Sequence, residues 1–521
     1  MKNVIKKAAD WCNRPMSVKV FLFMVGSVLS IYFMFLALAG MMDTDVYFLI
    51  SSGREFLENG ICRTNVWTID PGLSIIIQQW LYGVIVTLFS RFGAAGFVCL
   101  YLIQFIIFVC VFRYFMKLRG ISRSMIVSFL AVILFMGEVY IFSLRPELIT
   151  LIFLLLECIV LEQFRSSLHG VKDIAVSVMF LSFLMILEVN MHMSMGLFHF
   201  LLLLAYAVPA FYMPGSMRDD LHKYPGFLVF STLGMCGSMF LNPYGLDGVL
   251  YTINSFRSHA FDYVDVYEMR QPFLFSPFML SILICVLLVF FCRKHGVLRS
   301  STVNIVFGFA VIAGLAIRNN MFMTFAMIFI LRDFNDFLTS GSFVFNWRKD
   351  VCNYLLPVMV AFNLFVMFLF VSLISADPFD GFFHPDDLTP IYEKIQSDAA
   401  DKGLDEPRVF TDFNTGGYFQ YMGMKNLYID ARPELYTDVF TNGRNILRDY
   451  SVYCVYGFDS RDDSHVVTKD EFMKWFEHYD FDYIVVGRHC DLNLATSMLY
   501  MDGYEADDSI NSDDFILYKK L

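Results

Sequence analysis

Apolar runs about as long as a membrane-spanning helix recur along this 521-residue chain up to Ile374. A helix needs about 20 mostly apolar residues to cross a bilayer. Eleven segments meet or approach that length: Val20–Met41, Ala94–Phe115, Met125–Phe142, Leu148–Leu161, Ile174–Val189, Met195–Tyr212, Phe227–Leu241, Pro277–Phe291, Val303–Ile317, Met321–Leu331 and Tyr354–Ile374. The shorter segment Gln79–Phe92 carries Trp80 and Tyr82, so we predict an interfacial or re-entrant helix there, with a twelfth span as the alternative. The pattern predicts an α-helical polytopic membrane protein.

Basic residues set the predicted orientation of the spans. With eleven spans and a cytoplasmic N-terminus, every predicted inner loop carries Lys or Arg, as the positive-inside rule requires. The basic residues of these loops are Lys117, Arg119, Arg123, Arg165, Lys172, Arg218, Lys223, Arg293, Lys294, Arg299, Arg332, Arg348 and Lys349. A twelfth span at Gln79–Phe92 moves most of these residues outside. We therefore expect a multi-pass protein of the cell membrane with its C-terminal part outside the cytoplasm.

Three regions follow from this topology. Residues 1–19 form a cytoplasmic N-terminus whose lysines and Arg14 precede the first apolar run without a small-residue cleavage site, which indicates an uncleaved anchor. Residues 20–375 form the membrane domain, with its first outer loop at 42–93. Residues 376–521 form a soluble domain outside the cytoplasm.

The C-terminal region has the composition of a soluble, acidic domain. It holds 29 acidic and 13 basic residues, which argues against nucleic acid as a partner. Strands are expected at Arg408–Asp412, Asn426–Ile429, Tyr483–Gly487 and Phe515–Tyr518, and helices at Val439–Tyr450, Lys469–Tyr479 and Leu492–Met501. This alternation predicts a small α/β domain. Cys454 and Cys490 are candidates for a disulfide there, and spacing alone does not decide whether they pair.

Polar residues uncommon in membrane helices gather at the predicted outer ends. They are Asp43-x-Asp45, Arg145-Pro146-Glu147, Glu188-x-Asn190-x-His192, Asn242-Pro243-Tyr244-Gly245, Tyr267-Glu268 and Arg318-Asn319-Asn320. None of these residues was used to choose the topology. Their convergence predicts one outward-facing site near the membrane surface, because charged groups at the membrane edge cost free energy unless they are paired or used.

Asp43 and Asp45 are the candidate catalytic carboxylates, with His192 as a candidate proton donor or acceptor. A carboxylate can take the proton of an attacking hydroxyl. Together the two carboxylates are also candidates for holding Mg²⁺ or Mn²⁺ with substrate phosphate oxygens. The alternative for Asp43 and Asp45 is a solvated loop in which they cap helices. The alternative for His192 is a turn in which its ring is hydrogen-bonded to the backbone.

The remaining residues at these ends are candidates for binding substrate. Arginine matches phosphate oxygens in a bidentate fork, whereas Arg at helix ends often only extends its head group to the interface. The candidate binding residues are Arg54, Arg145, Glu147, Asn190, Asn242, Tyr244, Glu268, Arg318 and Asn319. In the tail, Asp412-x-x-Thr415-Gly416-Gly417-Tyr418 and Asp430-Ala431-Arg432-Pro433-Glu434 follow predicted strands, and a structural turn is the favoured interpretation of the second.

In order and spacing these motifs resemble a family of bacterial multispan proteins similar to the GT-C superfamily of glycosyltransferases. The resemblance is carried by Asp43-x-Asp45, Gly53-Arg54, Gly60, Trp80-Leu81, Arg145-Pro146, Asn190-x-His192, Asn242-Pro243-Tyr244-Gly245, Glu268, Arg318-Asn319, Asp412, Gly416-Gly417-Tyr418 and Asp430-x-Arg432. It implies a GT-C-like membrane domain that transfers a sugar from a polyprenyl-linked donor to an envelope glycan, lipid or protein. Asp43 or Asp45 would then activate the acceptor hydroxyl, and Arg145 or Arg318 would hold the lipid phosphate.

The first loop departs from the resembled pattern at two places. Tyr47-Phe48-Leu49 and Gln78-Gln79 stand where members usually have an aromatic-aromatic-His and a His-Glu. Two alternatives to an enzyme therefore stay open. One is a non-catalytic protein of the same fold that binds or presents a lipid-linked glycan. The other is a transporter or flippase, against which the absence of an internal repeat and of paired broken segments argues.

Overall fold

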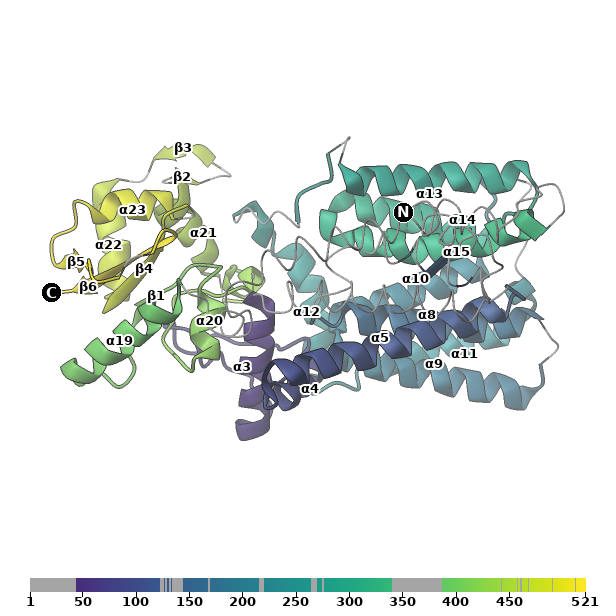
Figure 1. The fold of residues 1–521 in the computed structure, drawn as a ribbon, viewed down its shortest axis with the longest axis horizontal. Coiled ribbons are helices and arrows are strands. Elements are labelled where there is room, and N and C mark those ends of the chain that lie inside the picture. The colour runs from purple at the N-terminus through teal and green to yellow at the C-terminus, as the bar shows by residue number, and fades with distance from the viewer. Residues whose placement is uncertain are drawn as a thin grey trace, which may run out of the picture.

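The structure, a computed structural model, consists of a helical bundle and a mixed α/β tail domain at one end of the bundle (Figure 1). The residues described are 44–121, 126, 129–130, 133, 144–166, 169–214, 220–263, 269–273, 276–339, 387–441, 443–456, 458–459, 462–466, 468–489, 491–510 and 512–521. The predicted spans Val20–Met41 and Tyr354–Ile374, and most of Met125–Phe142, lie outside these residues.

The bundle and its outer segments comprise α3 (Thr44–Asn59), α4 (Trp80–Ser90), α5 (Gly93–Lys117), α8 (Glu147–Ser166), α9 (Val171–Met191), η1 (Met193–Met195), α10 (Gly196–Ala207), η2 (Asp220–Lys223), α11 (Pro225–Ser238), α12 (Leu246–Arg257), η3 (Ala260–Asp262), α13 (Pro277–Lys294), α14 (Ser300–Leu315), η5 (Ile317–Asn320) and α15 (Met321–Thr339). Helix α5 packs on α4 and α8, α9 on α11, and α14 on α10, α13 and α15. The apolar runs of the sequence thus pack on one another, as buried helical faces require.

Two described helices, at Ala95–Lys117 and Val171–Met191, are long and apolar enough to cross a membrane. The apolar helices Trp80–Ser90, Met193–Ala207 and Ser300–Leu315 are shorter. This finding supports a membrane protein and leaves the predicted number of eleven spans a prediction. The first outer loop is more ordered than we expected, because α3 occupies Thr44–Asn59 where the sequence predicted a loop.

Charged residues join the helix ends far from the tail domain. Arg332 of α15 is buried and binds Glu162 of α8, Asp333 and Thr302 of α14. Glu162 also accepts from Arg119, which follows α5. These contacts lie at one end of the bundle. They join helix termini that the charge pattern assigned to the cytoplasmic side. Buried charges are tolerated only when paired in this way.

The tail domain comprises α19 (Thr389–Lys402), β1 (Val409–Phe410), α20 (Gly416–Tyr421), η7 (Pro433–Tyr436), α21 (Ile446–Tyr450), η8 (Ser451–Tyr456, a π-helical turn), β2 (Phe458–Asp459), β3 (Asp462–Val466), α22 (Lys469–Tyr479), β4 (Tyr483–Gly487), α23 (Leu492–Met498), β5 (Tyr504–Ala506) and β6 (Phe515–Lys520). The sheet order is β1-β4-β6-β5, with β1 and β4 parallel and the other pairs antiparallel. A small mixed α/β domain is therefore confirmed.

The segment between α3 and α4 is part of the tail domain's sheet and core. Thr68 and Val409 both form parallel bridges to Leu427, so this segment adds a further strand position beyond β1. Its Trp67 and Ile69 share one buried cluster with tail residues such as Phe410 and Tyr428. Burial of apolar surface contributes about 25 cal/mol per Å². The first outer loop and the tail domain therefore form one structural unit.

Arg432 of the tail domain contacts the first outer loop directly. Its guanidinium lies over the rings of Phe48, at 3.8 Å from the ring centroid, and of Trp67, at 5.7 Å. Asp430 pairs with the same guanidinium and also accepts from Tyr436 at 2.9 Å. The tail motif around Asp430 is thus used structurally, in agreement with the favoured interpretation.

Several tail elements differ from the sequence prediction. Helix α22 and strand β4 have the predicted bounds, whereas α21 begins at Ile446 rather than Val439, because the Asn445 side chain caps the helix there by accepting from the Arg448 backbone N–H. The segment Asn426–Ile429 forms isolated bridges at Leu427 instead of a full strand. Cys454 is buried with a free thiol, and Cys490 lies outside the described residues.

Gly53 allows the close contact between α3 and α4 that orients the start of α3. A Cβ at this position would collide with the carbonyl oxygen of Gly83 and the hydroxyl of Thr87. We expect Gly53→Ala to destabilise the purified protein by about 1–3 kcal/mol, because overpacking displaces backbone. The measurement is thermal unfolding in detergent.

The matched control for this prediction is Gly226→Ala in α11, where an added Cβ meets nothing within 4 Å. Alanine favours a helix over glycine, so Gly226→Ala should leave the unfolding temperature unchanged or raise it. Equal melting of both variants and the wild type would contradict the proposed packing role of Gly53.

Candidate functional site

Two ion pairs form at the end of the bundle that faces the tail domain. Arg145, just before α8, pairs with Asp45 in the first turn of α3 at 3.2 Å between Nη2 and Oδ2. Arg318 in η5 donates from Nη2 to Oε1 of Glu147, the first residue of α8, at 3.1 Å. Both acids lie in the first turn of a helix, where the helix dipole favours negative charge.

His192 lies beyond the end of α9, and Glu147, Arg318 and Asp45 of these pairs act on it electrostatically. Its side chain is buried, and its Nδ1 has no hydrogen-bond partner. Burial lowers the pKa of His192, while the carboxylates of Glu147 and Glu188 act in the opposite direction. The net direction is downward, so the imidazole is neutral at neutral pH. A neutral imidazole has one nitrogen that carries a proton and one that accepts a proton, so His192 is able to act as a base.

Further buried polar atoms near His192 lack partners. Oε2 of Glu147 is one, and Oε1 of Gln78 is another. Gln78 lies near because its carbonyl accepts from the backbone N–H of Met193, the residue after His192. Leaving such an atom buried and unsatisfied costs about 1–3 kcal/mol. The three atoms together identify a place where a substrate hydroxyl or a water would gain hydrogen bonds.

The described residues offer limited ligation for a metal ion. No group of three His, Cys, Asp or Glu side chains that could hold one occurs among them. Asp45 already pairs with Arg145, so a Mg²⁺ or Mn²⁺ ion would need Asp43, which lies outside the described residues, and substrate phosphate oxygens. Metal binding by Asp43 and Asp45 stays a prediction.

Asn190 of α9 holds neighbouring segments together. Its amide accepts from the Trp80 indole at 2.8 Å and donates to the carbonyls of Ile186 and Leu241. These contacts tie the start of α4 and the turn after α11 to α9. The three hydrogen bonds engage the amide within the fold, beside the site rather than open to it.

Asn242 and Tyr244 form a turn that contacts the first outer loop. The Asn242 amide donates to the carbonyls of Met239 and Gly245, and its oxygen accepts from the Tyr244 backbone N–H. Gly245 has a φ of 56°, which a glycine adopts without strain. The Tyr244 hydroxyl donates to the carbonyl of Cys62 at 3.2 Å.

Two other predicted binding residues also contact the fold. Arg54 donates to the carbonyl of Tyr421 in the tail domain at 3.2 Å, and Asn319 donates to the carbonyl of Ile312 at 3.0 Å. Glu268 lies outside the described residues. Of the predicted site residues, the structure therefore brings together Asp45, Arg145, Glu147, His192 and Arg318.

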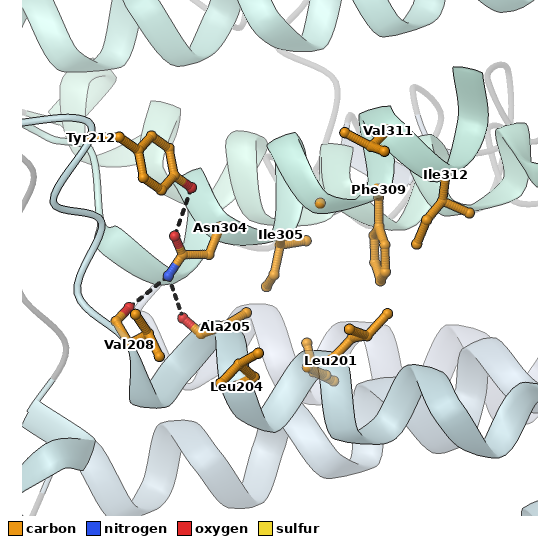
Figure 2. A pocket seen from close by; sticks show the side chains of 12 residues that line it. Leu201, Leu204, Ala205, Val208, Tyr212, Asn304, Ile305, Phe309, Val311 and Ile312 are labelled. Carbon is orange, nitrogen blue, oxygen red and sulfur yellow. Dashed lines mark hydrogen bonds between the residues drawn. The ribbon is translucent and has the colours of Figure 1, made fainter. Parts of the chain in front are cut away.

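An apolar groove opens on the surface of the bundle between α10 and α14. It has a volume of about 550 Å³, and its lining includes Leu201, Leu204 and Phe309. Figure 2 shows Asn304 and Tyr212 hydrogen-bonded at one end and Ile312 toward the other. The Ile312 end of the groove is the end nearer the candidate site, because the Ile312 carbonyl accepts a hydrogen bond from Asn319, the residue after Arg318. The groove fits a hydrocarbon chain that ends in a polar group.

His199 of α10 and Glu157 of α8 are ionisable residues that were not among the site residues predicted from the sequence. Both lie inside predicted spans, and the His199 ring contacts Glu157 and Glu188. An ionisable residue within an apolar run is itself a signal for function, and that signal was available for both.

Comparisons with known proteins find few similarities. No family model matches the chain, and no curated protein matches it. Among solved structures, the chain is similar to the crystal structure of an Archaeoglobus fulgidus oligosaccharyltransferase tethered to an acceptor peptide containing the NVT sequon. The sequence identity is 9%, the match covers 95% of this chain and 74% of that chain, and the TM-score is 0.48.

Asp412 of the tail motif is buried beside a second buried carboxylate, Asp491. One oxygen of Asp412 accepts from Thr415 and Asn414, and the other, Oδ2, has no partner. Burial raises the pKa of both aspartates, and the charge of Asp412 raises the pKa of Asp491 further. The Asp412 motif therefore shapes the turn after β1 at the cost of placing two acids in the core.

We expect Asp412→Asn to stabilise the tail domain at neutral pH by about 1 kcal/mol, because it removes one buried charge. In the wild type, the folded pKa values exceed the unfolded ones. Stability therefore falls as pH rises from the unfolded pKa, near 4, toward the folded value.

The gain from Asp412→Asn should disappear below about pH 4, where both acids are neutral in both states. The measurement is the unfolding temperature of wild type and variant from pH 4 to pH 8, with the exposed Asp508→Asn as control. A gain that is independent of pH would contradict this account.

Proposed function

We propose that the chain is a membrane glycosyltransferase that transfers a sugar from a polyprenyl-linked donor to a hydroxyl acceptor at the site of Asp45 and His192. The observation that carries the proposal is the convergence of two carboxylate–arginine pairs on a buried histidine with an unpartnered nitrogen. Two arginines, two carboxylates and a neutral imidazole provide the groups that phosphate binding and proton removal require. The resemblance of the sequence motifs motivates the class of donor.

The arginines supply the phosphate-binding step. A lipid phosphate entering the site offers oxygens that compete with Asp45 for the Arg145 guanidinium, since Arg binds phosphate in a bidentate fork. Asp45 is about one-third exposed, so it is accessible to an incoming ligand. Exchange of the carboxylate for phosphate keeps the arginine paired, and it releases Asp45.

Asp45, once released, activates the acceptor. The carboxylate takes the proton of the acceptor hydroxyl as its oxygen bonds to the sugar carbon, and the bond from that carbon to the phosphate oxygen breaks. The electron pair leaves with the lipid phosphate, whose charge Arg145 and Arg318 stabilise. The lipid of the donor is held in the apolar groove between α10 and α14.

A non-catalytic role in binding a lipid-linked glycan is the second candidate. The observation in its favour is that both Asp45 and Glu147 are engaged by arginines, so neither carboxylate is free in this state. The donor and the groove are common to both candidates. The two candidates differ in the role of Asp45. In the first, Asp45 is needed for turnover, and in the second it only balances the charge of Arg145.

The test is a mass-spectrometric survey of lipids that co-purify with wild type and Asp45→Asn. We expect a polyprenyl-linked sugar to accumulate on the variant, because a lost general base slows transfer by about 10²–10⁴-fold while the arginines remain. Asp247→Asn, an exposed acid paired weakly with Arg63, is the matched control and should resemble the wild type.

Equal retention of such a lipid by wild type and Asp45→Asn would contradict catalysis and favour the binding role. The absence of any polyprenyl lipid from both would contradict both candidates and favour transport. Once the donor is identified, transfer of its sugar by Asp45→Asn at the wild-type rate would rule out Asp45 as the base.

A further inference from the structure

Three ionisable side chains meet in the interior of the bundle, behind His192. Glu157 of α8, Glu188 of α9 and His199 of α10 are each at most 1% exposed. Nδ1 of His199 lies 2.7 Å from Oε2 of Glu157, and Nε2 lies 3.5 Å from Oε2 of Glu188. Ionisable groups at such a position are costly, and they are therefore usually functional.

The hydrogen bonds fix how many protons the triad holds. An imidazole that meets a carboxyl group at each nitrogen needs one proton in each contact. A protonated ring between two carboxylates satisfies this condition, and so does a neutral ring between one carboxylate and one carboxylic acid. Either arrangement of Glu157, His199 and Glu188 has a net charge of −1, so the triad lacks one proton for neutrality.

Glu157 has an oxygen available for that proton. Its Oε1 is buried and has no hydrogen-bond partner, whereas Oε1 of Glu188 accepts from the Thr150 hydroxyl at 2.6 Å. A buried carboxylate with an unsatisfied oxygen is less costly when it is protonated. The charged groups that act on His199 within the described chain are Glu157 from α8 and Glu188 from α9.

The triad lies one helical turn from the candidate site. His192 lies one helical turn after Glu188, and its backbone N–H donates to the Glu188 carbonyl at 2.6 Å. The Glu188 carboxylate acts electrostatically on the His192 ring. The two ion pairs of the site are each neutral, so the uncompensated charge that acts on His192 comes from the triad, through Glu188.

We propose that Glu157, His199 and Glu188 form a proton-binding site that takes up, through the site at His192, the proton released by the acceptor hydroxyl. The role in transfer rests on the proposed function, whereas proton binding by the triad does not. One proton arrives as the acceptor oxygen bonds to the sugar carbon, and the triad changes from a charge of −1 to neutral. The proton leaves again before the next turnover.

Infrared difference spectroscopy of the purified protein tests proton binding directly. Acidification should produce the carbonyl band of a protonated carboxyl group in the wild type and in Glu58→Gln, an exposed control on α3. The band should be absent from Glu157→Gln. An unchanged band in a folded Glu157→Gln would overturn the proposal.

Thr150→Val tests which carboxyl group takes the proton, because valine has the shape of threonine and leaves the charges in place. The lost hydroxyl donates to Glu188 and not to Glu157. If the proton goes to Glu157, loss of this hydrogen bond acts equally on both protonation states of the triad, so the titration midpoint should stay unchanged. A midpoint that moves to higher pH would place the proton on Glu188 and overturn the assignment to Glu157.

The pH dependence of transfer connects the triad to turnover. Below its midpoint the triad is already protonated, so kcat should fall as pH falls, and the midpoint of this limb should match the infrared midpoint. A kcat profile without this limb, or with a limb at a different pH, would overturn the role in transfer. Failure to find any donor would count against the proposed function, while the infrared midpoints would still decide on proton binding.

Discussion

A charge buried in this bundle is costly unless it is paired, because the hydrocarbon of a membrane cannot solvate it. Two sets of ion pairs lie at the two ends of the helices. At one end Arg332 binds Glu162, Asp333 and Thr302, and at the other Arg145 binds Asp45 and Arg318 binds Glu147. The first set joins α8, α14 and α15, and the second holds the start of α3 and the η5 turn against α8.

The tail domain contributes to the site through α3. Helix α20 packs on α3, and the ring of Tyr47 contacts those of Tyr418 and Tyr421 at centroid distances of 5.4 and 5.2 Å. Asp45 lies two residues before Tyr47, so its position depends on this contact as well as on Arg145. The tail domain is therefore part of the framework that fixes a catalytic candidate, because its core includes the first outer loop.

The sequence predicted elements and site residues with local signals, and it missed those that depend on distant partners. Helix α22 has a Thr468–Glu471 capping box, and β4 is a short apolar run, so both were found to the residue. Helix α3 was missed because its Ser51-Ser52-Gly53 centre is polar and small, and α4 and α20 support it. Asp45 and Arg145 were both candidates, but their pairing across 100 residues has no sequence signal. Asn190 stood out for its polarity in an apolar run, but its partner Trp80 is 110 residues away and could not be inferred.

The pairing of Asp45 in the resting state is consistent with catalysis. A charged group at the membrane edge costs free energy unless it is paired. Arg145 pairs with Asp45 at 3.2 Å until a ligand with phosphate oxygens replaces the carboxylate as its partner. The negative triad of Glu157, His199 and Glu188 adds a place for the proton that Asp45 or His192 acquires, so the base can be restored without release of a charge into the bilayer.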